Sequence, residues 1–183
     1  MHVPTIRPAT ESDLLGLVEV EVAAGQLFHT VGMPLVAADV PKIADLRKAV
    51  DAERIWATSI GGELAGYICA EVVDGNAHIA LVSVAPDYAR RGIGKAMINL
   101  VEAWGRSAGY AATTLTTFRD VPWNGPYYLR LGYEVLVRGQ IGPELARIME
   151  YEASLPGVDA SLRCAMIKSN DSPPVAAAED HTD

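Results

Sequence analysis

The chain has 183 residues, of which 50% are hydrophobic and 21% are charged, so it is long enough to bury one sizeable core. Its formal net charge is −8, which argues against nucleic acids and anionic membranes as partners and mildly favours cationic ligands. The first residues lack the apolar core of a signal peptide, and no apolar run approaches the length of a membrane span, so we expect a soluble, cytoplasmic protein.

Helical periods open the sequence. Thr10 with Asp13 resembles a weak capping box, and the apolar residues that follow recur at helical spacing up to Val22. Residues 25–38 have no clean period, which predicts a loop or a broken helix. Pro41 then stands where a second helix can begin.

Strand-forming residues dominate the middle of the chain. Residues 54–60, 63–73 and 77–84 are separated by Gly61-Gly62 and by the hairpin signal Asp74-Gly75. Because these connections are so short, the pattern predicts three consecutive antiparallel strands.

A helix and a further strand come next. Met97, Leu100, Val101 and Trp104 form the buried stripe of a helix, and residues 111–117 read as the next strand. A strand, a helix and a strand in this order predict a right-handed crossover between parallel neighbours.

The last third of the chain alternates again. It predicts a short helix over 126–131, a strand over 133–137, a helix over 143–153 and a strand over 163–168. We therefore expect a single domain over residues 1–169 and an acidic, disordered tail over residues 170–183. Cys69 and Cys164 lie far apart in apolar segments, which is typical of buried thiols in a reducing compartment, and no spacing supports a disulfide.

The junction V84-A-P-D-Y-A-R-R-G-I-G-K-A-M-I-N-L100 lies where a strand passes into a helix. Glycines at positions 92 and 94 let the backbone turn tightly and leave no side chain between its amides and a ligand. The first N–H groups of a helix have no internal partner, and the helix dipole adds partial positive charge there. Since Arg90, Arg91 and Lys95 add full charges, the junction is suited to hold a pyrophosphate.

The glycines of this junction also fit a plain turn, and they do not complete either of two common nucleotide-binding motifs. A G-x-G before a helix is a weak signal by itself, because glycine also serves plain turns. The third glycine of a G-x-G-x-x-G motif is missing, since Met97 stands there, and the chain has no G-x-x-x-x-G-K-[ST] sequence. The junction also follows an antiparallel meander, whereas a Rossmann domain opens with such a turn.

Two stretches resemble one known family. The run V82-S-V-A-P-D-Y-A-R-R-G-I-G-K-A-M97 resembles the acetyl-CoA-binding motif of the GCN5-related N-acetyltransferases (GNAT), with Ala89 where that family usually has Gln or Arg. The run T116-T-F-R-D-V-P-W-N-G-P-Y-Y-L-R-L-G-Y133 resembles their second hallmark, and its F-R-D-V-P-W-N part is similar to a bacterial subgroup of small acetyltransferases. The resemblance covers about residues 3–168.

This resemblance implies an α/β fold of the α+β type. The expected sheet is mixed and mostly antiparallel, is flanked by helices, and contains a splayed parallel pair formed by strands four and five. Acetyl-CoA would be the cosubstrate, a primary amine of a small molecule or peptide the acceptor, and no metal would take part. Dimerisation is common in the family, although no residue here indicates a homodimer.

The resemblance also assigns site residues. Tyr128 matches the tyrosine that faces the coenzyme sulfur in many relatives and would protonate the departing thiolate. The cofactor-binding positions would be Val82, Ser83, Val84, Arg90, Arg91, Gly92, Ile93, Gly94, Lys95, Ala96 and Asn124. The alternative role of Asn124 is to cap its helix.

The resemblance does not supply a proton acceptor for the amine at its usual position. Ala80 stands where the family often has a glutamate. If Asp74-Gly75 makes a two-residue turn, Glu71 faces His78, and this pair could take the proton through water. A cross-strand polar pair without catalytic role explains the same residues, and His29 is a weaker candidate.

Several conspicuous side chains have simple structural interpretations. Trp56, Trp104 and Tyr133 are expected in the core, and no His, Cys and carboxylate cluster has the spacing of metal ligands. Phe118, Trp123 and Tyr127 could shape an acceptor pocket or only pack. Glu19 and Glu21 are expected on a solvated helix face, where they could also attract a cationic substrate.

Two functions therefore remain open from the sequence. The favoured one is an acetyl-CoA-dependent N-acetyltransferase. The other is a noncatalytic acyl-CoA-binding sensor or interaction module, which the alanine at position 80 keeps open.

Overall fold

Seven strands and their helices make up the computed structural model, which describes residues 3–171. In chain order the elements are β1 (Thr5–Pro8), η1 (Glu11–Asp13), α1 (Leu14–Gly25), η2 (Gln26–Val31), α2 (Pro34–Ala37), α3 (Ile43–Asp51), β2 (Ile55–Ile60), β3 (Glu63–Val73), β4 (Asn76–Val84), η3 (Pro86–Tyr88), α4 (Ile93–Ser107), β5 (Ala112–Phe118), α5 (Gly125–Arg130), β6 (Glu134–Val135), η4 (Arg138–Gln140), α6 (Pro143–Ala153), η5 (Ala160–Leu162) and β7 (Arg163–Ser169), where η marks a 3₁₀ helix.

The strands form one mixed sheet in the order β1-β2-β3-β4-β5-β7-β6. The neighbours β4 and β5 run parallel, and the other neighbouring pairs run antiparallel. The parallel pair is joined by α4, as the crossover rule requires. The predicted fold class, a mostly antiparallel mixed sheet with one parallel pair, is confirmed.

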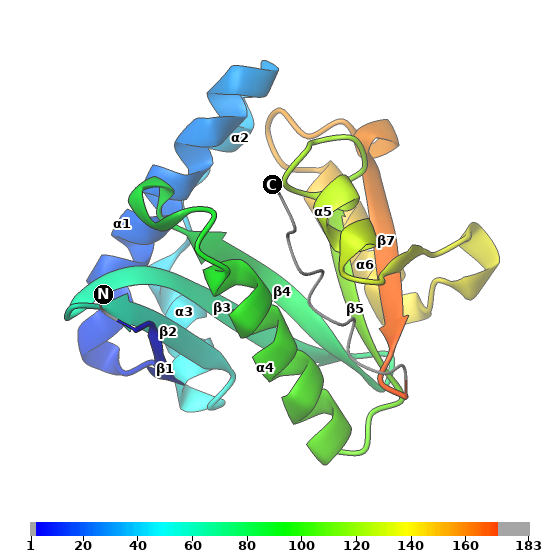
Figure 1. Ribbon diagram of the computed structural model, residues 1–183. Coiled ribbons are helices and arrows are strands. Elements are labelled where there is room, and N and C mark those ends of the chain that lie inside the picture. The colour runs from blue at the N-terminus through cyan, green and yellow to red at the C-terminus, as the bar shows by residue number, and fades with distance from the viewer. Residues whose placement is uncertain (1–2, 172–183) are drawn as a thin grey trace, which may run out of the picture.

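The parallel strands touch at one end only. Within the described residues, β4 pairs with β5 from Ala77 to Ile79, opposite Thr113 to Leu115. Beyond Ile79 the strands separate into a V, which Figure 1 shows opening away from their shared end. On its other edge β4 stays paired with β3 as far as Val84. The edge of β4 that faces the V is therefore open.

A β-bulge in β4 decides which side chains face which layer. Cys69 pairs with Leu81 while the next residue of β3, Ala70, pairs with Ile79, so Ala80 is the extra residue. A bulge interrupts the alternation of side chains along a strand. Ile79 therefore lies in the core under α4, whereas Leu81 packs on the opposite side, in the cluster that contains residues of α1.

Helices cover both faces of the sheet (Figure 1). α4 and α5 lie on one face, where Met97, Ile98 and Val101 of α4 are fully buried. α1 and α3 cover β1 to β4 on the other face, and α6 covers β5 to β7 there. The expected stripe of α4 is confirmed at Met97 and Val101, whereas Leu100 and Trp104 are only partly buried because they lie at its margin.

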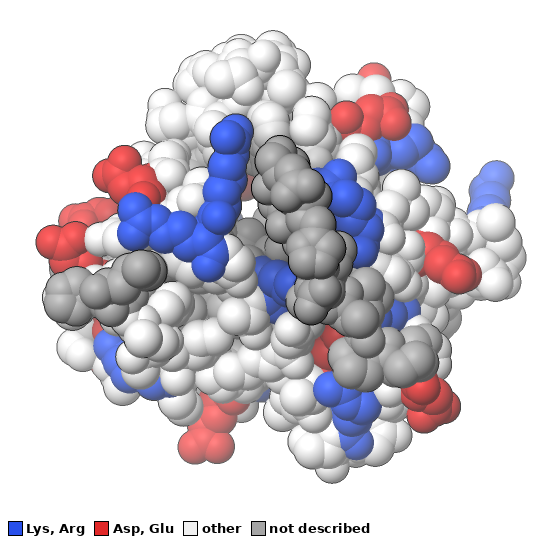
Figure 2. All heavy atoms as spheres, in the orientation of Figure 1, with Lys and Arg blue, Asp and Glu red and all other residues white. Residues whose placement is uncertain are grey.

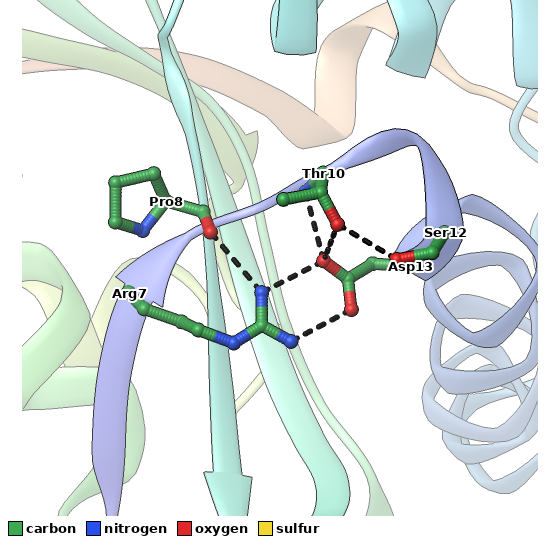
Figure 3. A network of polar contacts seen from close by, with 5 residues as sticks. All are labelled: Arg7, Pro8, Thr10, Ser12 and Asp13. Atoms are coloured by element: carbon green, nitrogen blue, oxygen red, sulfur yellow. Dashed lines mark hydrogen bonds and ion pairs between the residues drawn. The ribbon is translucent and has the colours of Figure 1, made fainter.

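An ion pair fixes the start of α1 to the first strand (Figure 3). Both terminal guanidinium nitrogens of Arg7 donate to the Asp13 carboxylate at 2.8 Å, and the backbone N–H of Thr10 donates to Asp13 Oδ2 at 2.8 Å. These donors hold the pKa of Asp13 well below its ordinary value. The predicted capping interaction between Thr10 and Asp13 is thus confirmed.

Some predicted boundaries are wrong. The second long helix begins at Ile43 rather than at Pro41, because Lys42 keeps an extended backbone and serves as its N-cap. β6 has only two residues, Glu134 and Val135, rather than five. In α1 the apolar spacing was expected to run up to Val22, but Val22 is 38% exposed and Val20 lies in the core instead. Residues 25–38 form the expected broken helix, as η2 and α2.

The helical run Glu11–Val31 also differs from expectation. With a mean hydropathy of 1.3, it is long and apolar enough to cross a membrane. Core helices of soluble proteins can have the same length and composition. Here Leu14, Leu17 and Val20 pack against the sheet, whereas Leu15, Val22 and Leu27 are exposed.

The folded part extends slightly beyond the expected domain boundary. Asn170 is buried; its Oδ1 accepts from Thr113 Oγ1 at 2.9 Å and its side-chain amide donates to the Tyr110 carbonyl at 2.7 Å. Asn170 therefore belongs to the domain and not to the tail. The rest of the predicted disordered tail, residues 172–183, lies outside the described residues.

Candidate active site

The open edge of β4, residues 80–84, forms one wall of the V. The opposite edge of β4 pairs with β3, whereas the edge that faces the V has no neighbouring strand beyond Ile79. The backbone groups on the V side are therefore available to an extended ligand. Val82 and Val84 pack toward α4, and the hydroxyl of Ser83 points to the α1 side. An arm that contains amide groups can add to this edge as a further strand.

The turn before α4 lies at the end of this edge. Arg90 and Gly92 adopt left-handed backbone conformations, with φ of 61° and 75°. The first intrahelical bond runs from the Ala96 N–H to the Gly92 carbonyl at 3.0 Å, so the preceding amides of the helix have no helical acceptor. Basic side chains gather over the segment between β4 and α4 in Figure 2. The turn therefore combines free amides with positive charge, which are the features of an anion site, and pyrophosphate binding here stays a prediction.

The basic side chains of this turn differ in how many contacts they make with the protein. Arg91 donates to the Asp87 carbonyl at 3.1 Å and lies over the ring of Tyr88, with 5.4 Å from Cζ to the ring centroid. Arg90 is exposed, and Lys95 is partly buried on the first turn of α4. Arg91 thus braces the turn, while Arg90 and Lys95 have freer side chains for an anionic ligand.

The start of α5 closes the second wall of the V. A side chain at Gly125 would lie 2.2 Å from the Arg119 carbonyl oxygen, so only glycine lets α5 begin so close to the end of β5. Asn124 Oδ1, just before this helix, is buried and has no hydrogen-bond partner among the described residues. A buried acceptor without a partner is costly, so this oxygen suits an N–H donor of a ligand in the V.

Two tyrosines of α5 occupy different places. Tyr128 is buried, its ring contacts those of Tyr127 and Tyr133 at 5.6 and 5.7 Å between centroids, and burial raises its pKa. Its hydroxyl is thus protonated at neutral pH, as the predicted acid role requires, and that role stays a prediction. The Tyr127 hydroxyl lies 3.3 Å from the place a side chain would take at Gly94. Tyr127 therefore reaches the first turn of α4, a position that its sequence pattern did not indicate.

His78 and Glu71 are opposite each other in the sheet, and the predicted register is confirmed. His78 is only 2% exposed, its Nδ1 lies 2.9 Å from Thr114 Oγ1, and burial lowers its pKa to about 4. Glu71 is exposed, and among residues 3–171 no hydrogen bond joins the two side chains. The geometry favours the cross-strand interpretation over a proton-accepting pair. Strict alternation along the strand would put His78 and Ala80 on one face, but Ala80 is the extra residue of the bulge, where the alternation is interrupted.

Glu21 differs most from its sequence interpretation. It was expected on a solvated helix face, but its carboxylate oxygen Oε2 accepts hydrogen bonds from the hydroxyls of Ser83 and Tyr67, the latter at 3.2 Å. Burial raises the pKa of Glu21, more than these two donors lower it, and the charge of Asp39 raises it further. Glu19, two residues earlier, is exposed as expected.

An apolar cavity lies where η2 meets the end of β5. The ring of Phe28 packs edge-on against Phe118 and Trp123, with 5.5 and 5.8 Å between centroids, so the segment after α1 reaches across to the β5 side of the V. The cavity has a volume of about 200 Å³ and is lined by Val31, Met33, Phe118, Asp120, Val121, Pro122 and Leu162. This agrees with a pocket-shaping position for Phe118. His29, the weaker base candidate, is exposed.

Comparison with known proteins agrees with this architecture. Residues 28–133 match the acetyltransferase (GNAT) family, and the chain belongs to that family. The fold is similar to the PaiA N-acetyltransferase from Thermoplasma acidophilum in complex with coenzyme A, with a TM-score of 0.69 and 16% identity over 91% of this chain and 99% of that chain.

Two further solved structures share the fold. The ribosomal-protein-S18-alanine N-acetyltransferase from Escherichia coli gives a TM-score of 0.67 at 18% identity, over 93% of this chain and 96% of that chain. The N-acetylglutamate synthase from Neisseria gonorrhoeae, complexed with coenzyme A and N-acetyl-glutamate, gives 0.70 at 13% identity, over 94% of this chain and 36% of that chain. Family membership and the splayed-sheet fold, both predicted from the two sequence motifs, are confirmed, and the chain is accordingly an acetyltransferase.

Proposed function

We propose that this acetyltransferase uses acetyl-CoA and transfers the acetyl group directly to a primary amine of a small molecule or peptide. The observation that carries the proposal is the continuity of the V: the open edge of β4 leads directly into the unpaired amides at the start of α4. One ligand that carries amides in an extended arm and a pyrophosphate at its end would meet complementary groups along its whole length.

The residues of this chain would divide the binding between them. Residues 82–84 would pair with the amides of the pantetheine arm, and residues 90–96 would hold the pyrophosphate. Asn124 Oδ1, which has no partner among the described residues, would accept an N–H of the arm. Coenzyme A complexes of the Thermoplasma and Neisseria proteins support a coenzyme of this kind.

The chemistry places one demand on the protein. When bound, the coenzyme supplies an acetyl thioester that is already activated. An alkyl amine with a pKa of about 10.4 is neutral in only roughly one molecule in a few thousand at pH 7, so a proton must be removed before attack. Tyr128, whose pKa is raised by burial, would serve at the other end of the reaction as a proton donor to the thiolate.

Thermal unfolding with and without acetyl-CoA tests the binding site. A ligand that binds only the native state stabilises it, by about 2.7 kcal/mol at 100 times its Kd, so a clear rise in Tm is expected. Gly94→Glu places bulk and negative charge at the turn and should abolish the rise. Gly94→Ala is the matched control, because its methyl group needs only a small shift of the Tyr127 hydroxyl and should keep most of the rise.

Thiol release then separates catalysis from mere binding. The unmodified chain should release free thiol from acetyl-CoA when a panel of primary amines is supplied. A rise in Tm without thiol release from any amine would support the noncatalytic acyl-CoA-binding module. An unchanged Tm at millimolar acetyl-CoA would contradict both functions.

A further inference from the structure

Glu21 reaches from α1 to the part of β4 that has no neighbour in the V. Ser83, which donates its hydroxyl hydrogen to Glu21 Oε2, lies four residues beyond Ile79, the last residue of β4 paired with β5. The bulge at Ala80 turns the Ser83 side chain toward α1 rather than toward α4. The carboxylate of Glu21 therefore stands against the same strand segment that would hold the acetylated arm.

In the part of the chain that the structure describes, this carboxylate has hydrogen-bond donors but no paired cation. Tyr67 and Cys69 of β3 face it, and Asp39 after α2 acts on it as a like charge. Among residues 3–171, no Lys, Arg or His forms a salt bridge with Glu21, and only its Oε2 atom is engaged in hydrogen bonds. A carboxylate held in this way has an oxygen and a negative charge left for a cationic partner.

The route of an acceptor amine agrees with this placement. The face of the sheet that α4 and α5 cover is filled by the largest core cluster, so an acceptor has to enter the V from the side of α1 and η2. Phe28 and the apolar cavity beside Phe118 border that side. An ammonium group that approaches the open edge of β4 from there meets Glu21.

We propose that Glu21 is the proton acceptor for the amine, and this inference rests on the function proposed above. The carboxylate binds the ammonium ion, takes one proton from nitrogen, and leaves the free amine. The nitrogen lone pair forms the new C–N bond at the acetyl carbon while the C–S bond breaks. The second nitrogen proton passes to water as the amide forms, Tyr128 gives its proton to the thiolate, which leaves as the thiol, and Tyr128 recovers a proton from water.

Ser83 and Tyr67 are positioning residues in this arrangement. Both hydroxyls donate to the same oxygen, so they fix the carboxylate between α1 and β4 and leave the other oxygen without a hydrogen bond among residues 3–171. The base missing at Ala80 is thereby supplied from a helix on the other side of the bulge. Glu71 and His78 are not needed for this step.

A purely structural role for Glu21 is the competing explanation. In that case the two hydrogen bonds only clamp α1 to the sheet, and their loss would affect stability and every reaction equally. The variant Glu21→Gln keeps the shape and an acceptor oxygen but cannot take a proton, and Glu19→Gln is the matched control on the exposed side of the same helix.

The test compares amines of different basicity in the thiol-release assay, with n-hexylamine, spermidine and an alanine-initiated peptide as alkyl amines and p-anisidine as an aromatic amine. For Glu21→Gln we expect a loss of about 10²–10⁴-fold in kcat/KM with alkyl amines at pH 7, the range for general bases. The loss should shrink as pH rises, and p-anisidine, already neutral at pH 7, should lose much less. The rise in Tm with acetyl-CoA should stay the same as in the unmodified chain.

Failure of acetyl transfer as such and failure of the role of Glu21 give different results. If the unmodified chain releases no thiol with any amine, the proposed function is overturned and the role of Glu21 with it. If it does release thiol but Glu21→Gln equals Glu19→Gln, or loses the same factor at all pH values and with both kinds of amine, Glu21 is not the proton acceptor. A variant that no longer gains Tm from acetyl-CoA would also overturn the inference, because its defect would then lie in coenzyme binding.

Discussion

Glu21 and Glu102 each carry a carboxylate from a helix to the sheet, but they meet different partners. Glu102 of α4 is 5% exposed; Lys168 Nζ donates to both of its oxygens at 3.0 and 2.9 Å, and the Tyr133 hydroxyl donates to Oε1 at 3.0 Å. Glu21 of α1 has two hydroxyl donors and no cation among the described residues. The first carboxylate is fully compensated, while the second keeps capacity for a ligand.

This difference separates a structural carboxylate from a functional one. In a buried ion pair each charge is compensated by its partner. Glu102 therefore joins α4 to β7, and its carboxylate is not available to bind a substrate. An uncompensated carboxylate at a wall of the V weakens the fold and is retained where function needs it. The two glutamates therefore predict opposite effects of the same Glu→Gln change.

The largest effect is expected at Glu102. Glu102→Gln leaves the Lys168 ammonium buried without its anion, and we expect a loss of about 3–5 kcal/mol in the free energy of unfolding. Urea unfolding followed by circular dichroism measures it. The double variant Glu102→Leu with Lys168→Met removes both charges and should recover most of the loss. A loss below about 1 kcal/mol for the single variant would mean that the pair is not the anchor inferred here.

For Glu21→Gln we expect a smaller change in the free energy of unfolding, and of opposite sign. Its pKa is raised in the folded chain, so the wild type loses stability as pH rises from about 4.5, the ordinary value, through the folded pKa. Glu21→Gln does not titrate and should be more stable at pH 7, by about 0.5–1 kcal/mol, with no difference below about pH 4. Urea unfolding at both pH values measures the difference. Destabilisation at pH 7 would indicate that Glu21 is a structural clamp.

Much of the fold follows from local sequence patterns. The alternating residues and the Asp74-Gly75 turn define the β3–β4 hairpin, and its register follows from the two-residue loop. The glycines before α4 indicated the turn, because its backbone conformation at Gly92 depends on local sterics. The start of α3 was misplaced, because Pro41 is compatible with a helix start but Lys42 is held in extended backbone.

The role of Glu21 could not be found in the same way. Tyr67 and Ser83 lie 46 and 62 residues further along the chain, and no local pattern joins them to Glu21. The bulge at Ala80 also shifts the faces of β4 by one residue, so strict alternation places its side chains wrongly. The available signal was two acidic residues, Glu19 and Glu21, in an otherwise apolar helix, and that signal equally fits a solvated face.

Amide chemical shifts during an acetyl-CoA titration test the central claim most directly, namely that the V between β4 and β5 holds the coenzyme. We expect the largest ¹H–¹⁵N shifts on Gly92, Gly94 and Lys95 at the turn and on residues 82–84 of the strand that has the open edge. Gly139, an exposed glycine far along the chain in η4, should stay unchanged. Shifts that leave Gly92 and Gly94 unmoved and gather elsewhere would contradict the site.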